Sequence, residues 1–121
     1  MGADLRLECL RDIVRGLTQN REVALALIEL RLESSRRPEI AMLIADWRHR
    51  AFTADVAFNA AAGLPGGPEE IALFHYAIDG LILDRLTTPL MPESTTDEAI
   101  DALVAGLLPS SRDSCVDKGK R

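Results

Sequence analysis

Apolar residues recur at helical spacing along most of this chain. Between Asp4 and Leu17 they form one broad arc with charged residues opposite, which predicts an amphipathic surface helix. From Val23 to Leu32 the chain is almost entirely apolar, so a second helix is expected there, mostly buried and capped at its N-terminus by Asn20. The first two predicted helices therefore differ in how much water they should meet.

A third helix is predicted to begin at Pro38, because proline lacks an amide hydrogen that the first helical turn does not need. Gly63 and Pro65 then form a stop signal. Apolar residues lie on two faces of this helix. This pattern predicts that the third helix lies between neighbouring helices.

A fourth helix is predicted from Pro68 to about Thr87. After its first turn it has no polar face, because Asp79, Asp84 and Arg85 point in three directions. A helix that is apolar on all sides needs to be buried, and a domain of five helices has too few neighbours to surround it. We therefore expect a second subunit to cover its remaining side, in a two-fold dimer.

A capping box formed by Thr95 and Glu98 predicts the start of a fifth helix, which Pro109 ends. The five predicted helices leave no stretch for a strand, so the expected fold is an all-α five-helix bundle. We expect one helical domain over residues 1–109 and a disordered polar tail over residues 110–121.

The charge balance argues against a surface that binds nucleic acid. The 121 residues carry a formal net charge of −5, and both lysines, Lys118 and Lys120, lie in the tail. No apolar stretch is long enough for a membrane span and the N-terminus lacks the features of a secretory signal, which predicts a cytoplasmic protein. The two cysteines, Cys9 and Cys115, fit neither a disulfide framework nor a metal spacing.

Aromatic side chains on the third and fourth predicted helices are suitable lining for an apolar ligand pocket, although each of them also fits an ordinary core position. Met42 and His49 share a helical face with Phe52, and His49 is either a hydrogen-bonding group in the pocket or a satisfied core histidine. The candidate ligand-binding residues are Arg31, Met42, Trp47, His49, Phe52, Phe58, Phe74 and Tyr76.

Arg31 is unusual among these candidates because it lies within an apolar arc of the second helix, where a cation needs a partner. That partner is either an anionic ligand or an internal acid such as Asp79. Alternatively, Arg31 lies near enough to the helix end for its charged group to reach water.

No pattern indicates catalysis, a metal ion or another cofactor. Di-metal sites in helical bundles use two Glu-x-x-His motifs, and this sequence has one near match, from Asp46 to His49, and no second. A Gly-x-Ser-x-Gly nucleophile elbow is also missing from the sequence. The chain is not expected to be an enzyme.

Several segments, taken in order, resemble the C-terminal domain of TetR-family transcriptional regulators. They are Arg36-Arg37-Pro38-Glu39-Ile40-Ala41, Ala45-Asp46-Trp47-Arg48, Gly63-Leu64-Pro65, and Ile78-Asp79-Gly80-Leu81-Ile82-Leu83 followed by Pro89. The resemblance implies that this domain encloses a small-molecule pocket. It also implies that the last two helices pack against the same pair of a partner as a four-helix bundle.

In that family, operator DNA is bound by an N-terminal helix-turn-helix domain. The residues before Asp4 are too few to form one, so no direct DNA contact is expected from this chain. The chain is then either an excised domain or a regulator without its DNA-binding part.

Residues and resemblance together predict an effector-binding and dimerisation domain of a TetR-like repressor, which senses a small apolar molecule and couples it to the geometry of a homodimer. The alternative is a helical dimerisation or adaptor module with no small-molecule ligand, and a cavity in the interior would distinguish the two. The residues predicted at the dimer interface are Ile71, Phe74, Ile78, Leu81, Leu103 and Leu107.

Overall fold

The computed structural model describes residues 2–107, and side chains from residue 5 onward. It consists of five helices: α1 (Gly2–Gln19), α2 (Arg21–Glu33), α3 (Pro38–Ala61), α4 (Pro68–Leu86) and α5 (Thr96–Leu107). The described residues contain no strand, so the all-α, five-helix prediction is confirmed. The expected tail over residues 110–121 lies outside the described residues.

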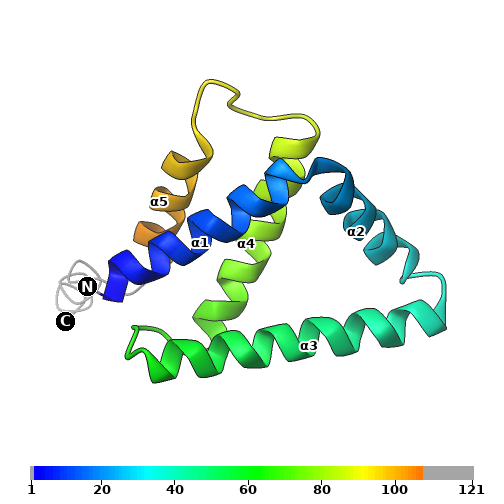
Figure 1. Ribbon diagram of the computed structural model, residues 1–121, viewed down its shortest axis with the longest axis horizontal. Coiled ribbons are helices and arrows are strands. Elements are labelled where there is room, and N and C mark those ends of the chain that lie inside the picture. Colours follow the sequence, from blue (N-terminus) through cyan, green and yellow to red (C-terminus); the bar gives the residue numbers. More distant parts are fainter. Residues whose placement is uncertain (1, 108–121) are drawn as a thin grey trace, which may run out of the picture.

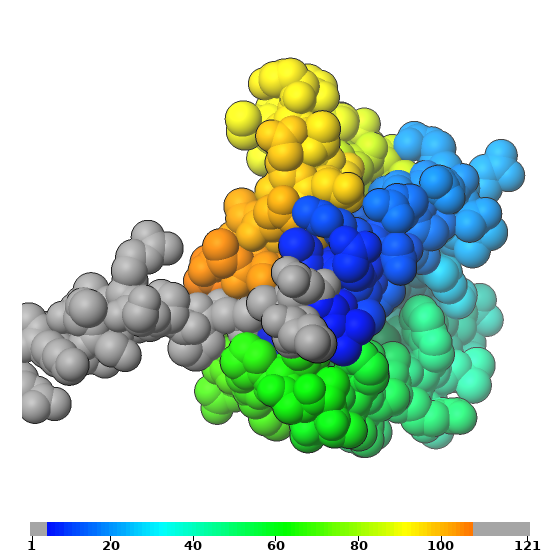
Figure 2. Space-filling model, turned by 60° about the vertical axis from the view of Figure 1, so that its left-hand side comes forward, coloured from blue at the N-terminus to red at the C-terminus, as the bar shows by residue number. Residues whose placement is uncertain are grey.

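The helices form an open frame (Figure 1). Helices α2, α3 and α4 lie along the three sides of a triangle, and α1 crosses over α4. Helix α5 contacts α1 and α4. From another side, α1 lies between α5 and the C-terminal part of α3 (Figure 2). Because α1 contacts α2, α4 and α5, it links α5 to the triangle.

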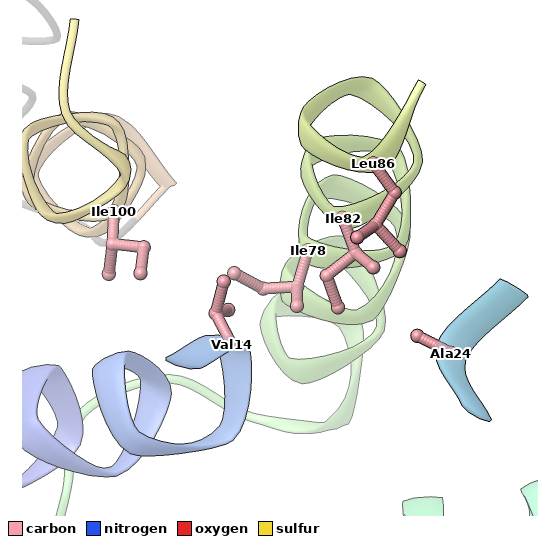
Figure 3. Packing of buried hydrophobic residues seen from close by; sticks show 6 residues of the cluster. All are labelled: Val14, Ala24, Ile78, Ile82, Leu86 and Ile100. Carbon is pink, nitrogen blue, oxygen red and sulfur yellow. The ribbon is translucent and has the colours of Figure 1, made fainter. Parts of the chain in front are cut away.

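The densest core forms where α1, α4 and α5 meet. Val14 of α1 and Ile100 of α5 are fully buried, and Val14 points toward Ile78 of α4 (Figure 3). Ala24 of α2 approaches α4 from its other side, near Ile82. The buried residues of α4 are spaced three and four apart, which gives this helix a single inner face: Ile71, Phe74, Ile78, Ile82 and Leu86.

The predicted starts of α4 and α5 are confirmed, and the predicted end of α5 at Pro109 lies outside the described residues. Pro68 is the first residue of α4, and the side chain of Glu70 accepts a hydrogen bond from the amide of Gly67 at 2.6 Å. At α5, the amide of Thr95 donates to Glu98 and the amide of Glu98 donates to the Thr95 hydroxyl, both at 3.1 Å. This is the reciprocal capping box that the sequence predicted.

The prediction that α2 is mostly buried is wrong. Ala24 is its only buried residue, and Leu32 is 64 % exposed. Helix α2 has the triangle's interior on one side and no neighbour among the described residues on the other, so its outer apolar residues face water. The predicted cap also differs, since the side chain of Asn20 donates to the carbonyl of Gly16 and thereby closes the end of α1.

Helix α3 is not enclosed by neighbours either. It packs against α2 and α4, and its buried residues are Ile44 and Asn59. Met42, on the face predicted to meet a second neighbour, is 74 % exposed.

Within the described part of the chain, no helix is both long and apolar enough to cross a membrane.

Candidate ligand-binding cavity

A cavity of about 220 Å³ lies between α1, α3 and α4, near the corner where α3 leads into α4 (Figure 1). It opens to solvent on one side, because Ile13 and Phe58 of its lining are about half exposed. Most of its wall is apolar, and polar groups enter it at a few points. The lining residues are Arg6, Cys9, Leu10, Ile13, Leu17, Asp55, Phe58, Asn59, Leu64, Ile71, Phe74, His75, Ile78, Asp79 and Ile82. An apolar space with a few convergent polar groups is the usual form of a small-molecule site.

The end of α3 builds one wall of this cavity. Gly63 has a φ of 68°, a left-handed conformation that glycine adopts without steric cost. Its amide donates to the carbonyl of Ala60, and the amide of Leu64 donates to the carbonyl of Asn59, the two hydrogen bonds of a Schellman motif. The chain therefore turns back over Asn59, and Leu64 is buried against the cavity.

Asn59 joins this turn to α1. Its side-chain amide donates to the carbonyls of Leu64, at 3.3 Å, and Gly66, at 3.1 Å. Its side-chain oxygen accepts a hydrogen bond from Nη2 of Arg6. Because Asn59 is buried, each of these hydrogen bonds replaces one to water that the side chain loses on folding. Asn59 thus fixes the position of the arginine beside the cavity.

Arg6 is the buried cation of the domain, with only 6 % of its surface exposed. Its Nη2 also donates to the carbonyl of Pro65 at 2.6 Å, and its guanidinium lies 5.3 Å from the centre of the Phe74 ring. Its Nη1 is buried and has no hydrogen-bond partner among the described residues. Burial lowers the pKa of Arg6, but an arginine stays charged at any physiological pH.

His75 provides a second polar point on the cavity wall. Its Nε2 lies 2.8 Å from a carboxylate oxygen of Asp55, and the ring of Phe52 meets the histidine ring edge to face at a centroid distance of 5.8 Å. The pair links α3 to α4 beside the cavity. The Nε2 atom of His75 is therefore already engaged by Asp55.

Asp79 borders the cavity and also two more open hollows. It accepts from Nη1 of Arg31 at 2.8 Å and lies 3.4 Å from Nη1 of Arg48, so one carboxylate ties α2 and α3 to α4. A hollow of about 340 Å³ lies between α3 and α4, and another of about 500 Å³ lies inside the triangle. Asp79 lines all three spaces. The internal acid expected for Arg31 is present.

The predicted ligand-binding residues separate into three groups. Phe58 and Phe74 line the cavity. Arg31, Trp47, Phe52 and Tyr76 line the hollows around Asp79. Met42 and His49 are exposed on the outer side of α3 and line none of the three spaces.

The two buried polar residues of the cavity, Arg6 and Asn59, were not predicted from the sequence. Arg6 shares a helical arc with Leu10, Ile13 and Leu17, at spacings of four, seven and eleven residues. That is the same signal that singled out Arg31. Asn59 similarly shares an arc of α3 with Phe52, seven residues before it. In both helices, a polar residue within an apolar arc marked the cavity.

Three of the six residues predicted at a dimer interface are buried inside the single chain. Ile71, Phe74 and Ile78 are on the inner face of α4 and have almost no exposed surface for a partner. They were assigned to the interface because α4 has no polar face, but α1 and the cavity use this side of the helix. Leu81, Leu103 and Leu107 are half-buried along α4 and α5.

Helix α4 also carries exposed apolar residues. Leu73, Tyr76 and Leu83 are exposed, and Tyr76 reaches 65 %. Tyr76 borders the hollow between α3 and α4, whereas Gly80 and Leu83 border the hollow inside the triangle. A methyl group built on Gly80 would meet open space. On α5, the exposed residues include Ala102, Ala105 and Gly106.

The described residues hold no group of three His, Cys, Asp or Glu side chains placed to bind a metal ion. Cys9 lines the cavity as a half-buried free thiol. The lining of the cavity offers apolar contact and one buried cation, Arg6.

Residues 1–110 match the model of a family described as "Tetracyclin repressor-like, C-terminal domain". The match covers all five helices. A comparison with curated proteins gave no match.

Proposed function

The chain belongs to the family of tetracyclin repressor-like C-terminal domains, and from this membership we propose that it is the effector-binding and dimerisation domain of a TetR-like transcriptional repressor. It takes up a small, largely apolar molecule in the cavity between α1, α3 and α4. Occupancy changes the geometry of a homodimer, and with it the affinity of the complete regulator for its operator. The domain works in the cytoplasm and performs no chemistry.

The observation that carries this proposal is the cavity itself. It brings an apolar lining from α1, α3 and α4 together with the buried guanidinium of Arg6, and a module that only holds other proteins needs no such combination. An engineered apolar cavity of roughly 150 Å³ takes up benzene. By that ratio, the volume of about 220 Å³ suits a molecule of roughly nine non-hydrogen atoms. The apolar wall favours a hydrocarbon body.

Uptake is tested with 1-heptanol, a neutral probe of suitable size. Thermal melts with rising 1-heptanol should show a stabilisation that grows with probe concentration, as mass action requires. Cys9→Phe puts a ring into the cavity and should abolish the shift. Leu5→Phe is the matched control, because Leu5 is exposed on the same helix and outside the cavity.

A result in which wild type, Cys9→Phe and Leu5→Phe all respond alike would mean that the probe binds elsewhere. The adaptor function would then be the better explanation.

Dimerisation through the outer side of α4 and α5 is the second part of the proposal. Leu73, Tyr76 and Leu83 of α4 are exposed, and apolar side chains in water on one helix suit a partner surface. Pairing two copies about a two-fold axis covers such side chains with their own equivalents and closes the assembly. Leu81, Leu103 and Leu107 are half-buried on the same two helices.

Helix α4 contributes to both the cavity and the proposed dimer interface. Its inner face, with Ile71, Phe74 and Ile78, lines the cavity, and its other side carries the exposed Leu73. A ligand that shifts α4 would therefore move the interface directly. This arrangement supports coupling through one rigid helix.

The interface is tested by Gly80→Asp. A side chain at Gly80 meets open space within one chain, so the monomer should fold normally. In the proposed dimer, the carboxylate enters a desolvated seam and should dissociate it. Gly16→Asp is the matched control, since Gly16 also lies in a helix with open space around it.

Sedimentation at tens of micromolar protein should give dimer for wild type and Gly16→Asp and monomer for Gly80→Asp. A monomeric wild type, or a Gly80→Asp variant that stays dimeric, would reject this interface.

A further inference from the structure

We propose that the ligand of the cavity is a monocarboxylate with a compact apolar body, whose carboxylate pairs with Arg6. This inference rests on the proposed function and narrows the ligand from any small apolar molecule to one chemical class. The carboxylate accepts hydrogen bonds from Nη1 of Arg6, and the body lies against the apolar wall formed by α1 and α4.

The first argument is the state of Arg6. Its guanidinium is almost completely buried, and its hydrogen-bond acceptors are the side-chain oxygen of Asn59 and the carbonyl of Pro65. Both acceptors are neutral. Removing a cation from water is costly, and buried cations in proteins are normally compensated by an anion. Among the described residues Arg6 has no such ion-pair partner, so a ligand anion would supply the missing charge.

The second argument is the vacant donor. Nη1 is buried and has no partner among the described residues, although the guanidinium has two N–H bonds on that atom. Buried donors of this kind are uncommon in folded proteins and call for an explanation. Arg6 lines the cavity, so a ligand that reaches its guanidinium would supply an acceptor.

The third argument concerns the other charges at the wall. Asp55 is paired with His75, and Asp79 is held by Arg31 and Arg48. These acids already have cationic or hydrogen-bonding partners. The one cation at the cavity without a counter-charge is therefore Arg6, which indicates a singly charged anion. A phosphate, with its higher charge and larger hydration cost, fits this site less well.

The space beyond Arg6 sets the rest of the molecule. Leu10, Ile13 and Leu17 of α1 and Ile71, Ile78 and Ile82 of α4 form an apolar wall. The volume suits roughly nine non-hydrogen atoms in total, by comparison with an engineered cavity that binds benzene. A carboxylate with about six further carbon atoms meets both limits.

The test compares heptanoate with 1-heptanol on the whole chain by titration calorimetry. Heptanoate should bind the wild type more tightly than 1-heptanol does. Arg6→Met keeps the length and apolar stem of the side chain but removes the charge. It should weaken heptanoate binding by about 10- to 100-fold, the value of a hydrogen bond to a charged group, and leave 1-heptanol binding within about twofold.

Arg15→Met is the matched control, because Arg15 lies on the same helix but is exposed and paired with Asp12. It should change neither affinity. Arg6→Lys keeps the charge without the forked donors, and should retain part of the preference for heptanoate.

Because Arg6 also holds the turn after α3, Arg6→Met removes a structural contact as well, and a wild-type measurement tests the proposal without this change. In ¹⁵N-labelled wild type, the side-chain N–H signals of Arg6 should shift on saturation with heptanoate and much less with 1-heptanol.

The outcomes separate this inference from the proposed function. If 1-heptanol binds in the cavity but heptanoate has no advantage, or the Arg6 signals do not respond to heptanoate, the carboxylate site is wrong and the proposed function stands. If neither probe binds the wild type, both are overturned.

Discussion

Arg6 and Arg31 approach the interior of this domain from two different helices and are held in opposite ways. Arg6 is buried beside the cavity, a region that we call the closed end of the interior, on neutral acceptors and with one nitrogen that has no partner among the described residues. Arg31 is 46 % exposed beside the hollow inside the triangle, which we call the open end, and forms an ion pair with Asp79. A charge that is already paired and partly in water has little to gain from a ligand. A buried, uncompensated charge has much more to gain.

The same contrast extends to the aromatic residues at the two ends. Phe74 lies under Arg6 and is 5 % exposed, whereas Trp47 borders the hollows around Asp79 and is 51 % exposed. The closed end is built as a core with one charge in it, and the open end as a surface. We therefore expect substitutions at the closed end to affect stability and binding far more.

The largest effect should come from Phe74→Ala. Removing a buried ring leaves a void, which costs about 3 to 5 kcal/mol. Trp47→Ala should cost less than about 2 kcal/mol, because half of the indole is already in water. Urea unfolding of both variants at the same protein concentration measures the difference. Equal costs would mean that the two ends are packed alike.

Asn59→Ala should have the next largest effect. It removes the acceptor of Arg6 and the donor to two loop carbonyls, and unsatisfied buried groups cost about 1 to 3 kcal/mol. The turn at Gly63 should also loosen, which faster amide exchange of Leu64 would report. Asn20→Ala is the control, since Asn20 is exposed and bonds one carbonyl. A loss no larger than that of the control would contradict the role of Asn59.

A smaller effect is expected from the ion pair at the open end. A double-mutant cycle with Arg31→Met and Asp79→Asn should give a coupling free energy of about 0.2 to 1 kcal/mol, because both groups are partly exposed. Added salt should reduce it further. A coupling several times larger, or one insensitive to salt, would show that Arg31 is as desolvated as Arg6.

The smallest effect concerns pH. Hydrogen bonds from the hydroxyl and the backbone amide of Thr95 lower the pKa of Glu98, a residue that does not line the cavity. A carboxyl whose pKa is lowered on folding stabilises the native state above its unfolded pKa, and this stabilisation disappears as the pH falls through the folded value. Urea unfolding should therefore become less pH-dependent below about pH 4.3 in Glu98→Gln. Glu93→Gln, in the exposed loop before α5, should leave the acid dependence unchanged.

Much of the fold could be predicted from the sequence. Pro38 and Pro68 begin α3 and α4, Gly63 ends α3, and Thr95 with Glu98 caps α5, because these signals act locally. What could not be predicted was which side of each apolar helix faces inward. That choice depends on helices distant in sequence, so the buried side of α4 and the exposed side of α2 became visible only in the packed structure.

The site was predicted less well than the fold. Aromatic content pointed to Phe58 and Phe74, which do line the cavity, but also to Met42, which faces away from it. The position of Arg6 depends on its hydrogen bonds with Asn59 and the carbonyl of Pro65, which lie 53 and 59 residues later in the chain. No local sequence pattern predicts such a contact. A charged residue within an apolar arc was the available signal, and it applied to Arg6 as well as to Arg31.

Locating a bound probe inside the domain tests directly whether the cavity is the ligand site. In methyl-labelled protein saturated with 1-heptanol, nuclear Overhauser contacts should connect the probe to the methyl groups of Ile71, Ile78 and Ile82, which line the cavity on α4. The exposed methyl groups of Leu32 and Leu43 should show no contact. Contacts confined to Leu32, Leu43 or other surface methyl groups would contradict the claim that this cavity is the ligand site.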